Sequence, residues 1–397
     1  MDLRYDVIIK GGLVVDPSQR LEGKMDVAIS GGRIAAVDDE IDPDKSDKVI
    51  DASNKLVTPG LVDLHTHVYW GVAHWSVEPD PTCLAKGVTT VVDAGTSGAL
   101  TFPGFRRYVI ENSNTRVLAL LHISSIGLTQ HPKVGDLQDL RSLDFDCAVN
   151  VAKRNSDVIK GVKIRVDKDN VGQNGPQALR LAKEAARSVG VPLMIHISGV
   201  LPDNLSLPEI LSIIEKGDVV THCLPPPFPP STDRSVILNK DGEIIPEVKE
   251  ARKRGVLFDV GHGSGSFSWE TAEKALKQGF VPDMISSDLH AYSLNGPVYD
   301  LATVLSKFLF LGLSLSKVVE LSTFAPASFL KFEDRIGTLK PGSEADVAIF
   351  SLESGKFPYY DNSQNPAIGL RGDVMKEKII DKRLEVFRVI KSGRIVP

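Results

Sequence analysis

Cysteine, clustered positive charge and long apolar runs are all scarce in this chain of 397 residues. Its three cysteines are too few for a disulfide framework. No apolar run approaches the roughly 18 residues needed to span a membrane, and the opening segment lacks a signal-peptide pattern. Basic residues are scattered along a chain with a net charge of −5, which argues against binding to a polyanion. We therefore expect a cytoplasmic protein that acts on a small molecule and binds neither nucleic acid nor membranes.

A Gly-x-Gly-x-x-Gly turn is also missing, which argues against an open, doubly wound dinucleotide-binding sheet. Residues 59–336 instead alternate short apolar runs with helical patterns. Eight of these runs are candidate strands: 61–67, 88–94, 116–124, 158–166, 191–197, 218–222, 256–260 and 283–288. Eight strand–helix units predict a closed (β/α)8 TIM barrel of the α/β class.

The two ends of the chain share a sequence pattern that differs from that of the middle. Residues 1–58 contain short apolar runs broken by glycine pairs, a pattern typical of hairpins. Residues 337–397 repeat it, with apolar runs near 345–350 and 386–396. We expect both ends to pair into one small β-sandwich domain, with the barrel inserted between them.

The most informative motif is His65-Thr66-His67, at the end of the first candidate barrel strand. Side chains at i and i+2 of a strand point to the same face, so two imidazoles can hold one metal ion. Many His-x-His pairs are incidental, but further candidate ligands accompany this one. His196, His222 and Asp288 also end apolar runs, on the face where barrels place their active sites. Buried histidines without a partner are costly, and a metal ion is a suitable partner.

Lys163 is unusual because it lies inside the apolar segment Val158–Val166. Burial lowers the pKa of a lysine, and the neutral amine can react with CO2 to form a carbamate, an anionic ligand with two oxygens. A lysine that reaches solvent or pairs with an acid is the simpler alternative. Lys160 competes for this role only if the strand faces the other way. Nitrogen and oxygen ligands around an open position fit zinc.

Together these residues resemble the amidohydrolase superfamily, and in particular its dihydroorotase-like amidohydrolase and deacetylase group. The matching features are Pro59–His67, Lys163, His196, His222, Asp288 and the late segment Gly337–Ala348, and the resemblance covers essentially the whole chain. It implies two divalent ions, most simply Zn2+. One would be bound by His65, His67 and Asp288, the other by His196 and His222, with N6-carboxylated Lys163 bridging them. Deaminase relatives carry a His-x-x-Glu motif, which this chain lacks after both His196 and His222.

The resemblance implies hydrolysis of an amide or ester bond in a small N-acyl or O-acyl compound. A metal-bound hydroxide would attack, and Asp288 would be the catalytic general acid and base. Opening of a cyclic amide is the alternative reaction, and a non-catalytic scaffold is the alternative class of protein. Relatives are commonly oligomers, so we expect a homo-oligomer.

The candidate substrate contacts are Arg165, His262, Gly263 and Tyr292. Arg165 shares the strand face of Lys163 and could meet a carboxylate, or form a structural ion pair. His262 and Gly263 follow the seventh candidate strand, and Tyr292 follows Asp288. The Pro-rich stretch 224–231 reads as an ordered loop over the barrel mouth, either a lid or a rigid connection.

Overall fold

The computed structural model describes residues 4–197, 200–226, 237–362 and 375–397. Its larger part is a parallel sheet of seven strands, hydrogen-bonded to one another in chain order. They are β6 (Leu61–Thr66), β7 (Val88–Gly98), β8 (Arg116–His122), β9 (Ile159–Arg165), β10 (Leu193–His196), β11 (Val219–Thr221) and β12 (Leu257–Asp259). Each coincides with one of the predicted strands.

The eighth position of the barrel is filled by the segment from Met284 to Leu289. On one side, the N–H of Val260 donates to the Met284 carbonyl at 3.1 Å. On the other, the N–H of His67 donates to the Leu289 carbonyl at 3.0 Å. This segment forms only isolated parallel bridges to β12 and β6, because Asp288 has a φ of 50° and interrupts the extended backbone. The barrel predicted from the sequence therefore closes, although its last strand is irregular.

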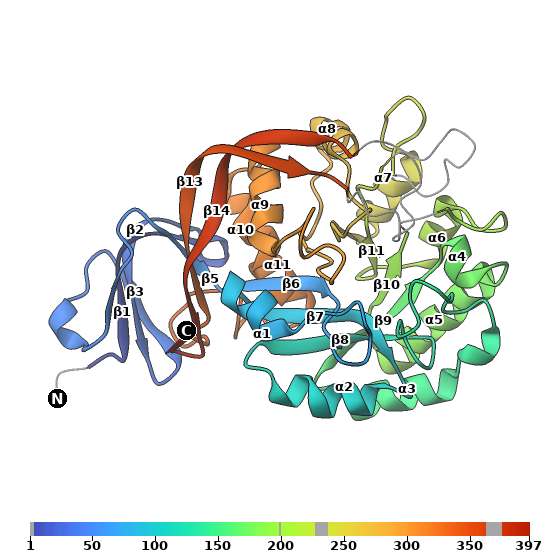
Figure 1. Ribbon diagram of the computed structural model, residues 1–397, viewed down its shortest axis with the longest axis horizontal. Helices are drawn as coiled ribbons and strands as arrows, with labels where there is room; N and C mark the ends of the chain where they lie inside the picture. The colour runs from blue at the N-terminus through green and yellow to red at the C-terminus, as the bar shows by residue number, and fades with distance from the viewer. Residues whose placement is uncertain (1–3, 198–199, 227–236, 363–374) are drawn as a thin grey trace.

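Helices surround these strands (Figure 1). They are α1 (Pro79–Thr82), α2 (Phe102–Tyr108), α3 (Phe145–Arg154), α4 (Lys168–Val171), α5 (Gly175–Val189), α6 (Leu207–Ile213), α7 (Pro246–Lys253), α8 (Trp269–Lys277), α9 (Leu301–Phe310), α10 (Leu315–Ser322) and α11 (Phe324–Phe329). Strand β8 shows how the core divides. Val117, Ala119 and Leu121 pack in the large cluster with the helices, whereas Leu118 and Leu120 belong to a separate cluster made mainly of strand residues. This alternation is the one expected of barrel strands.

The two chain ends form a second, mixed sheet. Its strands are β1 (Val7–Asp16), β2 (Leu21–Ser30), β3 (Arg33–Asp38), β4 (Val49–Asp51), β5 (Leu56–Pro59), β13 (Val347–Tyr360), β14 (Glu377–Lys391) and β15 (Arg394–Ile395). Antiparallel pairing of β5 with β13 joins the N-terminal and C-terminal parts. Buried aliphatic side chains from both ends, including Val27, Val57 and Val347, share one core.

Strands β13 and β14 are longer than the apolar runs of the sequence suggest. They form a hairpin that leaves the small sheet and crosses the barrel domain over α9 toward α8 (Figure 1). The backbone N–H of Leu384 donates to Ser306 Oγ on α9 at 2.8 Å. Tertiary packing on the barrel, and not the pattern of these residues, thus extends the hairpin.

Across the described parts of the chain, no helix is long and apolar enough to cross a membrane. Of the Pro-rich stretch, residues 227–231 lie outside the described residues, so its role as a lid or as a rigid connection stays a prediction.

Candidate metal centre

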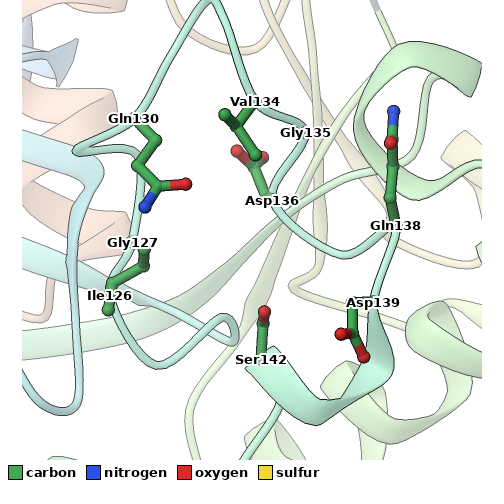
Figure 2. A pocket seen from close by; sticks show the side chains of 9 residues that line it. All are labelled: Ile126, Gly127, Gln130, Val134, Gly135, Asp136, Gln138, Asp139 and Ser142. Carbon is green, nitrogen blue, oxygen red and sulfur yellow. The ribbon is translucent and has the colours of Figure 1, made fainter.

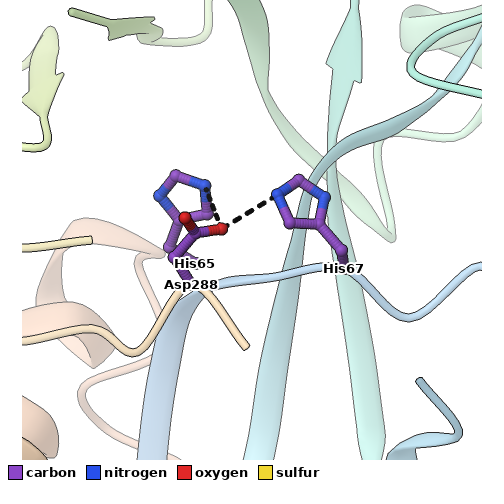
Figure 3. A group of neighbouring side chains, drawn as sticks. All are labelled: His65, His67 and Asp288. Atoms are coloured by element: carbon purple, nitrogen blue, oxygen red, sulfur yellow. Dashed lines mark ion pairs between the residues drawn. The ribbon is translucent and has the colours of Figure 1, made fainter. Parts of the chain in front are cut away.

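The structure brings the predicted metal ligands together at the carboxyl ends of the barrel strands. The Nε2 atoms of His65 and His67 lie 3.4 and 3.1 Å from Oδ1 of Asp288. Figure 3 shows this oxygen directed toward both imidazoles. Ligand atoms of the three residues all lie within 4.8 Å of one another, and all three residues are buried. This is the grouping expected of a site for one divalent cation.

Lys163, from β9, lies beside this group. Its Nζ is 3.3 Å from Nε2 of His65, and the side chain is fully buried. Burial lowers the pKa of Lys163 to about 7, so a large fraction of the amine is neutral near physiological pH. Lys160 is different: its Nζ is partly exposed and donates to the Ser156 carbonyl at 2.9 Å. Lys163, and not Lys160, therefore lies beside the group of His65, His67 and Asp288.

His196 and His222 form the neighbouring part of the centre. Nε2 of His222 lies 2.8 Å from Nδ1 of His196, and the His222 ring is 5.0 Å from the His65 ring between centroids. Nδ1 of His222 donates to the Gly261 carbonyl at 2.6 Å, because a carbonyl only accepts. The lone pair of His222 is thus on Nε2, the nitrogen that faces His196.

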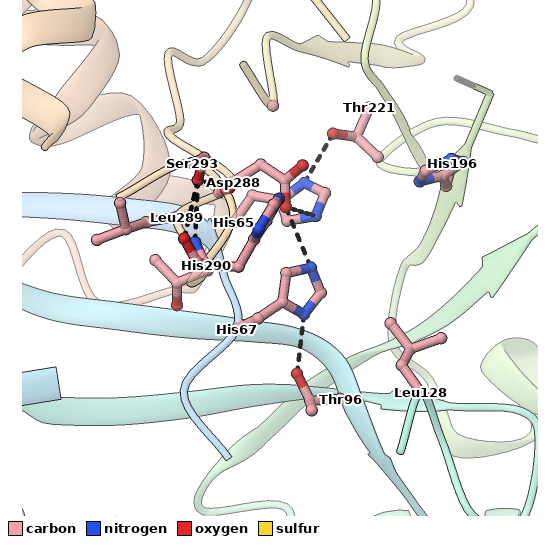
Figure 4. Close-up of polar contacts among 12 residues, drawn as sticks. His65, His67, Thr96, Leu128, His196, Thr221, Asp288, Leu289, His290 and Ser293 are labelled. Carbon is pink, nitrogen blue, oxygen red and sulfur yellow. Dashed lines mark hydrogen bonds and ion pairs between the residues drawn. The ribbon is translucent and has the colours of Figure 1, made fainter. Parts of the chain in front are cut away.

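Hydrogen bonds also fix the tautomer of His65 (Figure 4). The Thr221 hydroxyl donates to Oδ2 of Asp259 at 2.7 Å, so it accepts from Nδ1 of His65 at 2.9 Å. Nε2 is left with a lone pair toward Asp288. Nδ1 of His67 contacts Oγ1 of Thr96 at 2.8 Å in a similar arrangement. Burial lowers the pKa of both imidazoles well below the ordinary value, which keeps them neutral, as metal ligands must be.

The backbone at the centre adopts conformations that non-glycine residues rarely take. His222 has a φ of 65° and Asp288 a φ of 50°. Such strain persists only where the surroundings hold it in place, and it is common at functional sites. Neighbouring glycines make the room: a Cβ on Gly263 would lie 2.3 Å from Oδ2 of Asp288, and one on Gly95 would lie 2.7 Å from Cγ of Lys163.

Three buried carboxylates beneath the centre were missed by the sequence reasoning. Asp259 accepts from Thr221, Asp63 accepts from Ser287, and Asp93 accepts backbone N–H groups. Burial raises the pKa of Asp63 to about 7 and that of Asp259 to about 6. Their signal in the sequence was an acid inside each apolar strand. Single buried acids of this kind are ambiguous until a partner is known.

The candidate substrate contacts lie in different surroundings. The guanidinium of Arg165 donates to both carboxylate oxygens of Asp136 at 2.7 and 2.8 Å, which is the structural ion pair that the sequence left as the alternative. Tyr292 lies near the mouth, with its hydroxyl 3.0 Å from Nε2 of the exposed His74. Gly263 lies against Asp288, as described above.

His262 requires a correction. Its ring is buried and stacks on Phe267, with centroids 4.5 Å apart. Nδ1 lies 2.9 Å from the Gly263 carbonyl, and Nε2 lies 2.8 Å from Nζ of Lys307. Both ring nitrogens are therefore used within the protein, and the imidazole is not offered to a substrate. Strand position alone could not show this, because it does not tell which way a side chain turns after the strand ends.

A cavity of 290 Å³ lies elsewhere on the same loop face (Figure 2). It is lined by residues of the segment between β8 and α3, among them Gln130, Asp136 and Ser142. None of the six predicted metal ligands lines it, so it is not the metal centre itself.

The donor set at the centre fits a divalent cation. Neutral imidazole nitrogens with fixed lone pairs and a buried carboxylate converge at one point, and such nitrogen and oxygen ligands suit zinc and related ions. Burial raises the pKa of Asp288 well above its ordinary value. A nearby cation would favour the ionised carboxylate and relieve that cost.

Comparison with known proteins supports the same conclusion. The profile of the Amidohydrolase family matches residues 56–396. The chain belongs to the amidohydrolase family. Members of this family generally use divalent metals, and the chain is a hydrolase of this type.

Individual amidohydrolases give more detail. The chain is 35% identical to a deacetylase of Agrobacterium fabrum, over 95% of this chain and 89% of that protein. A solved dihydroorotase is 31% identical, with a TM-score of 0.86 and coverage of 98% and 97% of the two chains. A solved adenine deaminase is 30% identical, with a TM-score of 0.86 and coverage of 99% of both chains.

Proposed function

We propose that this amidohydrolase is a binuclear, zinc-dependent deacylase that cleaves an amide or ester bond in a small N-acyl or O-acyl compound. The observation that carries the proposal is the convergence of His65, His67 and Asp288 with the buried amine of Lys163 3.3 Å away. The likeness to a deacetylase over 95% of the chain supports the choice of an acyl substrate.

In this proposal His65, His67 and Asp288 would hold one ion, and His196 and His222 would hold the other. N6-carboxylated Lys163 would supply a further anionic ligand with two oxygens. The neutral amine that carboxylation requires is favoured by burial, which lowers the pKa of Lys163 to about 7. Divalent ions bound there supply Lewis acidity, which polarises a carbonyl and makes water a better nucleophile at neutral pH.

Asp288 performs the proton transfers. Its carboxylate accepts a proton from the water that attacks the acyl carbon. The same group then donates that proton to the leaving nitrogen or oxygen, so the products are a carboxylic acid and an amine or alcohol. Gly263 places no side chain beside this carboxylate and so leaves it room to act.

Opening of a cyclic amide is the second candidate. The same metal ligands would serve both reactions. The likeness to a dihydroorotase structure at 31% identity supports cyclic-amide opening as the second candidate. The shape of the pocket decides between the two substrates, and the metal ligands do not distinguish them.

The test begins with elemental analysis of purified protein, alongside Lys163→Ala. About two equivalents of zinc in the wild type and a marked loss in the variant are expected. One equivalent, unchanged in the variant, would remove Lys163 from the centre. The loaded enzyme is then assayed with acyl amides, acyl esters, cyclic amides and adenine. Turnover confined to cyclic amides or to adenine would overturn the deacylase proposal.

A further inference from the structure

Helix α9 carries a lysine whose surroundings the metal centre does not explain. Lys307 is fully buried. Its Nζ contacts three acceptors: Nε2 of His262 at 2.8 Å, the Pro297 carbonyl at 2.9 Å and the Tyr360 carbonyl at 2.6 Å. A buried lysine is costly compared with methionine or leucine, so a purely space-filling role would not select it.

The hydrogen bonds around Lys307 have one consistent direction. Nδ1 of His262 donates to the Gly263 carbonyl, since a carbonyl only accepts. Nε2 of His262 therefore accepts, and Nζ of Lys307 must donate to it. Burial lowers the pKa of Lys307 well below its ordinary value, but three acceptors use all three N–H groups of an ammonium, whereas a neutral amine would leave one acceptor unpaired. The aromatic rings of Phe267, Trp269 and Tyr359, 5.6–6.0 Å from Nζ, also favour the cation.

The chain of contacts continues from His262 to Asp288. The N–H of His262 donates to the Ser286 carbonyl at 3.2 Å, and the N–H of Gly263 donates to the Ser287 carbonyl at 2.9 Å. These bonds hold the turn against the backbone that leads directly into Asp288. Because a Cβ at Gly263 would lie only 2.3 Å from the Asp288 carboxylate, the position of this turn limits where the carboxylate can lie.

The other end of the chain of contacts is the long hairpin. Tyr360 is the last residue of β13, and its carbonyl is one acceptor of Lys307. Close by, Nε1 of Trp269 on α8 donates to the Lys376 carbonyl at 3.1 Å, next to the start of β14. The far end of a hairpin from the small sheet is thus fastened to the barrel helices beside the turn that borders the metal centre (Figure 1).

We propose that Lys307 and His262 are positioning residues that connect the docked β13–β14 hairpin to the Gly261–Gly263 turn and so hold the Asp288 carboxylate in its working position. The inference rests on the proposed metal-dependent function for its activity readout. It adds a role for the small sheet, whose hairpin supports the site from outside the barrel.

The test uses Lys307→Met, His262→Phe and the double variant that carries both substitutions. Ser306→Ala is the control. Ser306 is a matched control, because it also fastens the hairpin to α9, through Leu384, and its hydroxyl donates to the Ala302 carbonyl and not to His262. Thermal unfolding, zinc affinity by chelator competition, kcat and KM are measured for each protein. Amide hydrogen exchange at the Gly261–Gly263 turn is followed in metal-free protein, so that one readout is independent of metal and substrate.

Lys307→Met and His262→Phe are each expected to speed amide exchange at the turn. Each should also lower zinc affinity and kcat by about 10–100-fold, with KM little changed. The double variant should be no worse than the more severe single one, since both break one connection. Ser306→Ala should lower the melting temperature but leave the exchange at the turn, zinc affinity and kcat near wild type.

Unchanged exchange at the turn in a folded Lys307→Met or His262→Phe protein overturns the proposal, as do effects that simply multiply in the double variant. If Lys307→Met does not fold, His262→Phe decides, because it keeps the ring stacking on Phe267 and the hairpin contacts of Lys307. If the wild-type protein binds no zinc but the variants still exchange faster at the turn, the metal-dependent function is rejected. The proposed connection between the hairpin and the turn is then retained.

Discussion

Replacement of Gly263 by alanine tests how closely the turn and Asp288 depend on each other. The new Cβ would lie 2.3 Å from Oδ2 of Asp288, whereas ordinary contacts begin at 3.4 Å. One of the two atoms must therefore move by about 1 Å. A displacement of that size near a reacting group can cost about 100-fold in rate, so we expect kcat to fall by about that factor.

The same substitution also places alanine at a φ of 54°, which costs roughly 1–2 kcal/mol of folding stability for any residue with a side chain. Gly279→Ala separates the two effects. Gly279, in the turn after α8, has a φ of 78°, but a Cβ there would meet nothing within 4 Å. It should show the stability loss without the loss of activity.

The assay is hydrolysis of the best acyl substrate by zinc-loaded protein, with kcat and KM measured separately and with unfolding followed in denaturant. Gly263→Ala should lose kcat and Gly279→Ala should keep it, while both lose similar stability. Wild-type kcat in a folded Gly263→Ala protein would refute the reasoning, because the carboxylate would then have been free to move without consequence.

Three further substitutions or conditions follow from contacts described above or from other buried charges. Thr221→Val removes the acceptor that fixes the tautomer of His65 and should weaken zinc binding by about 10–100-fold, measured by chelator competition. Lys183→Met leaves the buried carboxylate of Asp218, 2.6 Å away, with two backbone N–H donors but no cation, and should lower the free energy of unfolding by about 3–5 kcal/mol. Burial opposes ionisation of Asp26, but hydrogen bonds from Lys10 and two backbone N–H groups outweigh it and lower the pKa of this carboxyl. Its stabilising effect is therefore present above the unfolded value of 3.8 and should be lost as the pH falls below it, seen as a falling free energy of unfolding.

Each of these predictions has its own control. Thr221→Ser keeps a hydroxyl and should bind zinc more nearly like wild type; equal affinity in both variants would exclude the tautomer argument. Arg187→Ala removes an exposed partner of Glu215 and should cost less than about 1 kcal/mol. A similar loss in Arg187→Ala and Lys183→Met would show that burial is not the cause. Lys10→Met should flatten the acid dependence, and an unchanged slope would contradict the role given to Asp26.

How far the sequence predicts the site depends on where each residue lies. His65, His67, Lys163, His196, His222 and Asp288 could be chosen because each interrupts or ends an apolar run, and the parallel strands of a barrel deliver such positions to one face. The buried acids Asp63, Asp93 and Asp259 could not be given a role, because each accepts from a donor far away in the chain, namely Ser287, Val68 and Thr221.

The sequence by itself determined the periodicity of the strands, the pairing of the chain ends into a second sheet and the identity of the candidate ligands. These follow from local alternation of apolar residues and from the limited number of ways in which strands and helices pack. Only the tertiary structure decided that Arg165 is held by Asp136 and that His262 turns away from the centre to meet Lys307. It also decided that the β13–β14 hairpin lies across α9. No local pattern encodes which way a side chain points after a strand ends, or which distant segments come into contact. Both depend on side-chain packing across the whole fold.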